Sequence, residues 1–305
     1  MKSPIRLLAL VLTLSLATTL NGCSPSIDKL IKQGADAQKI KNYSQAEAIY
    51  RKIIQREPNN AKAYYKLCDV LNDQNKLDDA VAACQKSITL NTNDAQTYFV
   101  LGIVLQKQKK LEEALKSYRR AIELDPKYAY AYYGVGNVLY DQKKLEEALK
   151  SYRRTIELDP KFASPHVGVG NVLRDQKQLE EALKSYRRAI ELDPKLAYAY
   201  NNVGNVLRDQ KQLEEALKSY RRAIELDPKF AGSHSNIGLV LKEQGKLEEA
   251  ISKYRQALSL PEDKLTTPAS AHTLTHNYLG LALQQQGNLE QAIRHLRKQS
   301  KPLCS

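Results

Sequence analysis

A seventeen-residue segment that recurs at a fixed interval constrains this chain more than any other feature. LEEALKSYRRAIELDPK stands at 111–127 and recurs unchanged at 179–195 and 213–229, while the copy at 145–161 differs only by Thr155. Successive copies begin 34 residues apart. A fixed period of this length indicates a repeat architecture, in which each unit is one small supersecondary motif stacked on its neighbours.

The composition indicates that each unit is helical. The 305 residues include 13 Gly and 11 Pro, and Leu, Ala, Lys, Glu and Gln dominate. These five residue types favour helices, whereas Gly and Pro interrupt them. We therefore expect an all-α protein.

Eight positions recur in register when each unit is numbered from its first alanine, at Ala95, Ala129, Ala163 and Ala197. Apolar residues at steps of three and four predict two helices per unit, a first helix A and a second helix B. Gly at position 8 and Ala at position 20 are small where the two helices must approach. Tyr at position 24 is large enough to fill a gap toward the next unit. In the unit that begins at Ala95 the eight residues are Tyr98, Leu101, Gly102, Leu105, Ala114, Tyr118, Ala121 and Pro126.

Two kinds of residue mark the helix ends. Asp125-Pro126 is expected to stop helix B, and the proline suits the first turn of the following helix. Gly245 and Gly287 stand at position 15, where a positive φ can end helix A, and Asn75 can adopt the same conformation there.

This register resembles that of the tetratricopeptide repeat family, and the resemblance covers about residues 27–300. It implies a right-handed superhelical α-solenoid of about eight helix-turn-helix units. It also implies a concave face, lined mainly by helix A, that binds an extended peptide of a partner protein.

The two ends of the solenoid depart from the repeat. Units beginning at Ile27 and Ala61 keep part of the pattern, and the polar stretch 262–272 predicts a loop before a last unit that resumes at Thr273. That unit has Gln299 at position 27, where a polar residue suits a terminal helix with nothing stacked beyond it. We expect the solenoid to span 27–305.

The N-terminal residues resemble a bacterial lipoprotein signal. Lys2 and Arg6 precede a short apolar stretch, and Leu-Asn-Gly-Cys ends at Cys23. The stretch is too short to span the ~30 Å of bilayer hydrocarbon as a helix. We expect 1–22 to be removed, Cys23 to carry the lipid and 23–26 to form a short tether. The protein would then lie in the bacterial cell envelope, anchored to a membrane and facing away from the cytoplasm. The alternative is a secreted or periplasmic soluble protein.

Two cysteines within the repeats have two possible roles. Cys68 and Cys84 could form a disulfide in an oxidising compartment, or pack as small buried apolar residues. The sequence favours the second role and leaves the first open.

Polar side chains at the concave positions of helix A are the candidate ligand-binding residues. Asn at position 9 offers a donor and an acceptor to the backbone of an extended ligand. Basic residues follow at position 12 and acidic residues at position 13, so an amide row would lie between a cationic and an anionic row. The candidates are Asn137, Asn171, Asn205, Asn202, Asn236, Arg174, Arg208, Lys242, Asp175, Asp209 and Tyr133.

The net charge of +13 supports an alternative function on the other side of the molecule. Lys116, Arg119 and Arg120 recur in every copy and would form a basic stripe along the convex face, able to bind an anionic membrane surface or another polyanion. We also expect Glu112 to pair with Lys116 and Arg119 with Glu123, four residues apart on helix B.

No sequence pattern indicates catalysis, a cofactor or a metal. The chain has no P-loop, HExxH or GxSxG, and GVG at 134–136 and 168–170 lies within helix A. His166, His234 and His276 occupy a packing position in units that stand too far apart to share a zinc ion. We expect a non-enzymatic protein whose partners are a protein or peptide and a membrane, and we do not expect a nucleic acid partner.

Overall fold

The computed structural model describes residues 25–261 and 271–299. Every regular element in this part of the chain is a helix, and the helices form eight consecutive pairs. Within each pair the odd-numbered element is helix A and the even-numbered one is helix B. The helices are α1 (Ile27–Lys39), α2 (Tyr43–Arg56), α3 (Ala61–Asp73), α4 (Leu77–Leu90), α5 (Ala95–Lys107), α6 (Leu111–Leu124), α7 (Ala129–Asp141), α8 (Leu145–Leu158), α9 (Ser164–Asp175), α10 (Leu179–Leu192), α11 (Ala197–Asp209), α12 (Leu213–Leu226), α13 (Ala231–Glu243), α14 (Leu247–Ser259), α15 (Ala271–Gln285) and α16 (Leu289–Gln299).

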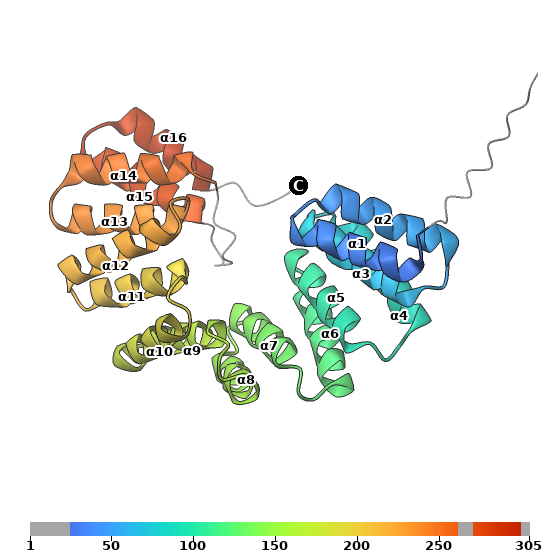
Figure 1. The fold of residues 1–305 in the computed structure, drawn as a ribbon. Coiled ribbons are helices and arrows are strands. Elements are labelled where there is room, and N and C mark those ends of the chain that lie inside the picture. The colour runs from blue at the N-terminus through green and yellow to red at the C-terminus, as the bar shows by residue number, and fades with distance from the viewer. Residues whose placement is uncertain (1–24, 262–270, 300–305) are drawn as a thin grey trace, which may run out of the picture.

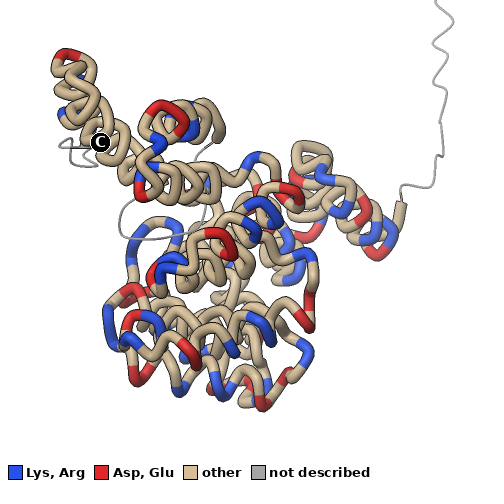
Figure 2. Tube along the Cα trace, turned by 90° about the vertical axis from the view of Figure 1, so that its left-hand side faces the viewer, with Lys and Arg blue, Asp and Glu red and all other residues tan. Residues whose placement is uncertain are grey.

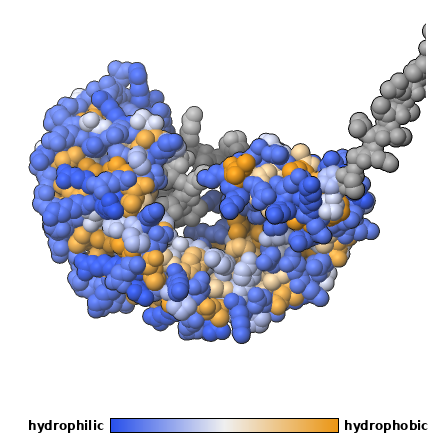
Figure 3. Space-filling view, viewed as in Figure 1, coloured by the Kyte–Doolittle hydropathy of each residue, from blue (hydrophilic) through white to orange (hydrophobic). Residues whose placement is uncertain are grey.

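The pairs stack side by side into an open arc, with α1–α4 at one end and α13–α16 at the other (Figure 1). Each helix contacts the next one in sequence, and from α3 onward each helix A also contacts the following helix A. Hydrophilic residues cover much of the outer rim, with smaller apolar groups between them (Figure 3). The predicted all-α solenoid is confirmed.

A contact between positions 8 and 24 holds the two helices of a unit together. The position-24 tyrosines, among them Tyr118 and Tyr186, are almost completely buried. A Cβ atom added to Gly102 would lie 2.6 Å from the ring of Tyr118, and one added to Gly170 would lie 2.5 Å from the ring of Tyr186. Any larger residue would therefore push the helices apart, since buried side chains are close-packed.

The same tyrosines also link successive units. A Cβ atom on Gly134, at position 6 of the next unit, would lie 2.7 Å from Tyr118, and one on Gly168 would lie 2.6 Å from Tyr152. The ring of Tyr118 thus fits between the glycines of two helices A, which is the gap toward the next unit that the sequence predicted.

In the second unit a disulfide replaces this contact. Cys68 stands at position 8 and Cys84 at position 24, and the two are bonded with their Cα atoms 5.2 Å apart. The sequence favoured two unbonded cysteines packed as small apolar residues; both are buried as expected, but the bond, which the sequence left open, is present. The pair occupies the two positions that hold the glycine–tyrosine contact in units such as that of Gly102 and Tyr118.

The residues at position 15, in the turn between the two helices of a unit, have the positive φ that the sequence predicted. Gly245 and Gly287 have φ of 80° and 87°, and Asn75 has φ of 60°. The copied units instead place lysine in this left-handed conformation, at Lys109, Lys143, Lys177 and Lys211. A side chain is disfavoured there by about 1–2 kcal/mol, so these turns are held by the packing of the helices on each side.

Two predicted boundaries need correction. Helix α6 ends at Leu124 as expected, but α7 begins only at Ala129, so Pro126 lies in the turn and not in the first turn of a helix. Helix α15 begins at Ala271, where the Thr275 hydroxyl donates to the Ala271 carbonyl oxygen. The predicted loop at 262–272 therefore ends before Ala271, and its residues 262–270 lie outside the described residues.

Reduction of the disulfide should destabilise the N-terminal units. A cross-link between cysteines separated by 16 residues restricts the unfolded chain and contributes about 3 kcal/mol. We expect thermal unfolding, followed by circular dichroism, to shift to lower temperature in reductant. The variant Cys68→Ser/Cys84→Ser is the control and should show the lower transition with or without reductant. A wild-type transition temperature that is the same with and without reductant would contradict this expectation.

Candidate functional site: the concave groove

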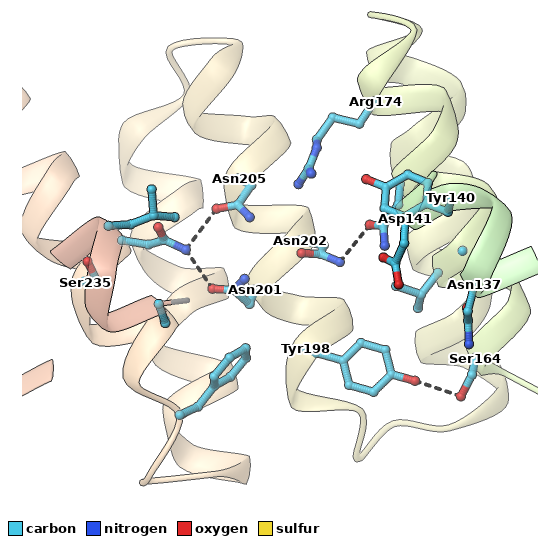
Figure 4. Close-up of a pocket in the computed structure, with 18 of the residues that line it drawn as sticks. Asn137, Tyr140, Asp141, Ser164, Arg174, Tyr198, Asn201, Asn202, Asn205 and Ser235 are labelled. Atoms are coloured by element: carbon cyan, nitrogen blue, oxygen red, sulfur yellow. Dashed lines mark hydrogen bonds between the residues drawn. The ribbon is translucent and has the colours of Figure 1, made fainter. Parts of the chain in front are cut away.

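A cavity of about 620 Å³ lies on the inner side of the arc. Its walls come almost entirely from helices A, from α5 through α15, as the concave positions of the repeat predict. The volume is typical of ligand-binding clefts. Figure 4 shows side chains of successive helices A pointing into it.

All the predicted groove residues except Lys242 and Asp175 line this cavity. Lys242 is half-buried in the last turn of α13. Asp175 accepts a hydrogen bond from the Tyr140 hydroxyl at 3.0 Å, and its carboxylate lies 3.5 Å from the Lys143 ammonium. Residues that the sequence analysis did not select also contribute: Gln106, Ser164, Asn201, Phe230, Ser235 and Tyr278.

The position-9 asparagines have a structural role that the sequence analysis missed. The buried Tyr152 hydroxyl donates to Asn137 Oδ1 at 2.9 Å, that of Tyr186 to Asn171 Oδ1 at 2.8 Å, and that of Tyr220 to Asn205 Oδ1 at 2.9 Å. A buried hydroxyl without a partner costs about 1–3 kcal/mol. Each asparagine therefore provides the hydrogen-bond acceptor for the buried hydroxyl of the tyrosine that packs its own unit together.

Units without this asparagine support the assignment. The hydroxyls of Tyr50 and Tyr254 have no hydrogen-bond partner among the described residues, and position 9 of their units is Ala35 and Leu239. Tyr118, whose unit has an isoleucine at this position, donates to Gln106 instead. The hydrogen bond could therefore have been predicted from the sequence, because Asn at position 9 occurs together with Tyr at position 24 in these units.

A second set of amides connects one unit to the next. Asn202 Nδ2 donates to Asn171 Oδ1 at 3.1 Å, and Asn236 Nδ2 donates to Asn205 Oδ1 at 3.0 Å and to Asn201 Oδ1 at 2.9 Å. Figure 4 shows these bonds crossing the inner face. The oxygens of Asn171 and Asn205 thus each accept two hydrogen bonds, which uses both lone pairs.

The charged rows are partly paired with each other. Arg208 Nη2 lies 3.2 Å from Asp209, and Arg174 Nη2 lies 3.8 Å from Asp175. The arginine side chains keep 21% and 26% of their surface exposed. The Arg174 pair is longer than a hydrogen bond, and both guanidinium groups are accessible to a ligand carboxylate or carbonyl.

Tyrosines at the cavity wall remain neutral hydrogen-bonding groups. Burial raises the pKa of Tyr133 and of Tyr140 to about 12. The Tyr198 hydroxyl lies 2.8 Å from Ser164 Oγ, which fixes the ring against the neighbouring helix α9 (Figure 4).

The convex stripe carries both signs of charge. Arg120 Nη1 lies 2.8 Å from Glu123 and its guanidinium lies 5.9 Å from the centroid of Tyr98, an arrangement repeated in other copies. The predicted pairs with Lys116 and Arg119 are wrong, because Glu123 faces Arg120 three residues away, and Glu112 accepts from Gln142 of the next unit. Figure 2 shows acidic residues interleaved with basic ones along the helices.

The histidines do not gather around a metal position. His234 is buried, whereas His276 Nδ1 lies 2.9 Å from His295 Nδ1, and burial lowers the pKa of both members of this pair. Within the described ranges no group of three or more His, Cys, Asp or Glu side chains could hold a metal ion. No helix in that same part of the chain is long and apolar enough to cross a membrane.

Family models recognise the repeats. A model of the TPR repeat matches 107–143, 170–207 and 204–245, and models of the tetratricopeptide repeat match 129–162 and 233–267. This chain is a tetratricopeptide repeat protein. A model of subunit 3 of the anaphase-promoting complex, or cyclosome, also matches the N-terminal units at 39–121. No curated protein matches the sequence.

Solved structures place this tetratricopeptide repeat protein among helical solenoids. The match with a tetratricopeptide repeat protein from Parabacteroides merdae ATCC 43184 covers 84% of this chain and 98% of that protein, at 16% identity and a TM-score of 0.68. The match with the Cut9–Hcn1 hetero-tetramer of the APC/C covers 92% of this chain and 54% of that chain, at 18% identity and a TM-score of 0.68. Against YrrB, described as a TPR protein with an unusual peptide-binding site, the chain is 30% identical over 59% of its length and 92% of YrrB, with a TM-score of 0.44.

The link between Asn171 and Tyr186 predicts a measurable coupling. Asn171→Ala should lower the free energy of unfolding by about 1–3 kcal/mol, because the buried Tyr186 hydroxyl loses its acceptor. We expect Asn171→Ala/Tyr186→Phe to lose less than the sum of the single changes, measured by urea unfolding. Additive losses would show that the two side chains are independent.

Proposed function

We propose that this protein is a non-catalytic interaction scaffold that binds an extended segment of a partner protein in its concave groove. Tetratricopeptide repeat proteins generally mediate protein–protein interactions. The observation that carries the proposal is the cavity on the inner face, into which consecutive helices A direct amide, guanidinium and phenol groups. Such evenly spaced polar groups suit a ligand whose own groups repeat along its length, as a peptide backbone does.

Several groups in the groove are available to a ligand. The oxygens of Asn171 and Asn205 are occupied by protein donors, but no described residue accepts from their Nδ2 groups. Arg174 and Arg208 stand beside them, and their guanidinium groups are partly exposed. These groups can donate hydrogen bonds to the backbone carbonyls or acidic side chains of a ligand, and the carboxylates of Asp141 and Asp209, which also line the cavity, can accept them.

We further propose that the scaffold is held at a membrane of the bacterial envelope by a lipid on Cys23, facing away from the cytoplasm. The apolar N-terminal stretch and Leu-Asn-Gly-Cys support this, although 1–24 lie outside the described residues. The disulfide between Cys68 and Cys84 also supports it, because structural disulfides persist in oxidising compartments. Helix α1 begins at Ile27, so at up to ~3.6 Å per residue the tether keeps the first unit near the bilayer.

Mass spectrometry of the protein from its native membrane tests the anchor. We expect a mature N-terminus at Cys23, increased in mass by acyl chains, because several chains are needed for stable anchoring. Cys23→Ser should release the protein from the membrane fraction. An unmodified N-terminus at another residue would instead support a secreted or periplasmic soluble protein.

Paired arginine variants test the groove. A partner should first be captured by crosslinking in the native membrane, and its dissociation constant then measured with purified proteins. We expect Arg174→Gln/Arg208→Gln to weaken binding about tenfold or more, which corresponds to about 1.4 kcal/mol. Arginines are preferred to asparagines here because changing Asn171 also weakens the fold.

The matched control is Arg187→Gln/Arg221→Gln, which removes the same charge from the convex face of the same two units. It should leave the affinity within about twofold of wild type. Loss of binding in this control, with steep weakening by salt, would instead favour the convex stripe as a polyanion-binding surface.

A further inference from the structure

One face of each later helix A packs against helix B of the preceding unit. Thr97, at position 3 of its unit, lies 3.3 Å from Ser87 of the preceding helix B. Gly134, at position 6, faces the ring of Tyr118 on the preceding helix B. Position 10 lies on the same side of the helix, since residues three and four apart share a face. This face is therefore a packing surface wherever another unit comes before it.

In α1 the same face is exposed and mainly basic. The described residues contain no helix before α1, which lies at one end of the arc (Figure 1). Positions 3, 6, 10 and 13 of this first unit are all exposed, and they are Lys29, Lys32, Asp36 and Lys39. An end unit needs a polar outer surface, but it does not need an excess of one sign of charge.

Position 14 departs from the repeat in the first unit. Each of the seven other units has glutamine there, and six of these glutamines donate to a carboxylate of the preceding unit, as Gln142 does to Glu112 at 2.8 Å. In the first unit the residue is Ile40, which is 74% exposed and stands between Lys39 and Lys41. A large exposed apolar side chain between two cations is typical of a contact with a membrane interface.

The chain that leads to Cys23 leaves beside this face. The side chain of Ser26 caps α1 by accepting from the Lys29 amide, and Arg56 Nη1 donates to the Pro25 carbonyl oxygen at 2.9 Å. Four residues separate Cys23 from Ile27, so at up to ~3.6 Å per residue a lipid on Cys23 lies within ~14 Å of the start of α1. The face itself is ~16 Å long at ~1.5 Å per helical residue.

We infer that this face of α1, together with the adjoining turn, binds the surface of an anionic phospholipid bilayer. We call it the basic end face, and it consists of Lys29, Lys32, Asp36, Lys39, Ile40 and Lys41. Its lysines contact the phosphates of the headgroups, and Ile40 enters the interface between headgroups and acyl chains. The inference rests on the proposed lipid at Cys23 and adds the orientation of the protein on its membrane.

This orientation suits the proposed groove. The basic end face points back along the direction in which the units stack, so the later units extend away from the bilayer. The cavity between α5 and α15 then remains accessible to a partner.

The basic end face is better suited to phosphate than the convex stripe is. Among the described residues Lys29, Lys32 and Lys39 form no ion pair, whereas on the convex face Arg120 lies 2.8 Å from Glu123 and similar pairs recur in other copies. Unpaired lysines can contact headgroups without first giving up a carboxylate.

Binding to vesicles in a flotation assay tests the inference. The protein is the mature chain from residue 23 with Cys23→Ser, which contains every described helix. At low ionic strength we expect it to bind vesicles of phosphatidylglycerol and phosphatidylcholine in equal amounts, and not vesicles of phosphatidylcholine alone. Without the lipid this binding is reversible, so washing still releases the same variant from a membrane fraction.

Two variants locate the binding surface. Lys29→Gln/Lys32→Gln/Lys39→Gln should weaken vesicle binding about tenfold or more, because three headgroup contacts are lost. Ile40→Gln, which introduces the residue that the other units have, should weaken it about threefold or more.

The matched control is Lys116→Gln/Lys150→Gln/Lys184→Gln, which removes the same charge from exposed positions on the convex face. It should bind within about twofold of the Cys23→Ser parent. Failure of the parent to bind anionic vesicles, or weakening by the convex variant in place of the α1 variant, would overturn the inference.

A fluorescent reporter tests the contact in the acylated protein. The chain contains no tryptophan, so Ile40→Trp introduces a single one. In vesicles whose acyl chains carry bromine we expect its fluorescence to be quenched, and to recover when Lys29, Lys32 and Lys39 are also changed to Gln. Tyr130→Trp on α7 is the control and should not be quenched. Unquenched fluorescence from Ile40→Trp would also overturn the inference.

The anchor and the basic end face fail separately. If Cys23 of the native protein carries acyl chains but the Cys23→Ser chain does not bind anionic vesicles, the anchor stands and the membrane-binding face falls. If Cys23 carries no lipid but the lysines of α1 are required for vesicle binding, the anchor falls and the membrane-binding face stands.

Discussion

The contact of a buried tyrosine on helix B with a glycine on helix A is the constraint on which the rest of the structure depends. The rings of Tyr118 and Tyr186 occupy the space that a Cβ atom on Gly102 or Gly170 would need. This contact sets the distance between the two helices of a unit, and where the next unit also has glycine it sets the distance between units. It recurs in six of the eight units; a disulfide takes its place in the second unit, and Gly280 faces Leu296 in the last.

The polar end of the same tyrosine connects this packing to the groove. Its hydroxyl lies beneath the position-9 asparagine, occupies the amide oxygen and orients the amide. Asn171 and Asn205 therefore stabilise the solenoid and shape its inner surface at once. Substitution of either is expected to change stability as well as the proposed binding, so Arg174 and Arg208 are the better probes of the proposed groove.

Much of the fold could be predicted from the sequence because the repeat register is so regular, and the misses share one physical cause. The register predicted the helix pairs, the left-handed turns at Gly245 and Gly287 and the concave positions. It also places Cys68 and Cys84 on facing positions, so reading the register across both helices predicts their disulfide, whereas considering each cysteine alone did not. The hydrogen bond from Tyr186 to Asn171 joins residues on different helices, and its direction depends on neighbours in space that no local pattern specifies.

The most direct test of the central claim is nuclear magnetic resonance of the asparagine side-chain amides, with asparagine selectively labelled with ¹⁵N and a purified partner added. The account predicts that the Nδ2 resonances of Asn171 and Asn205 shift on binding, because their oxygens are held by tyrosine and their NH2 groups meet the ligand. Unchanged resonances at both positions, with binding intact, would contradict it.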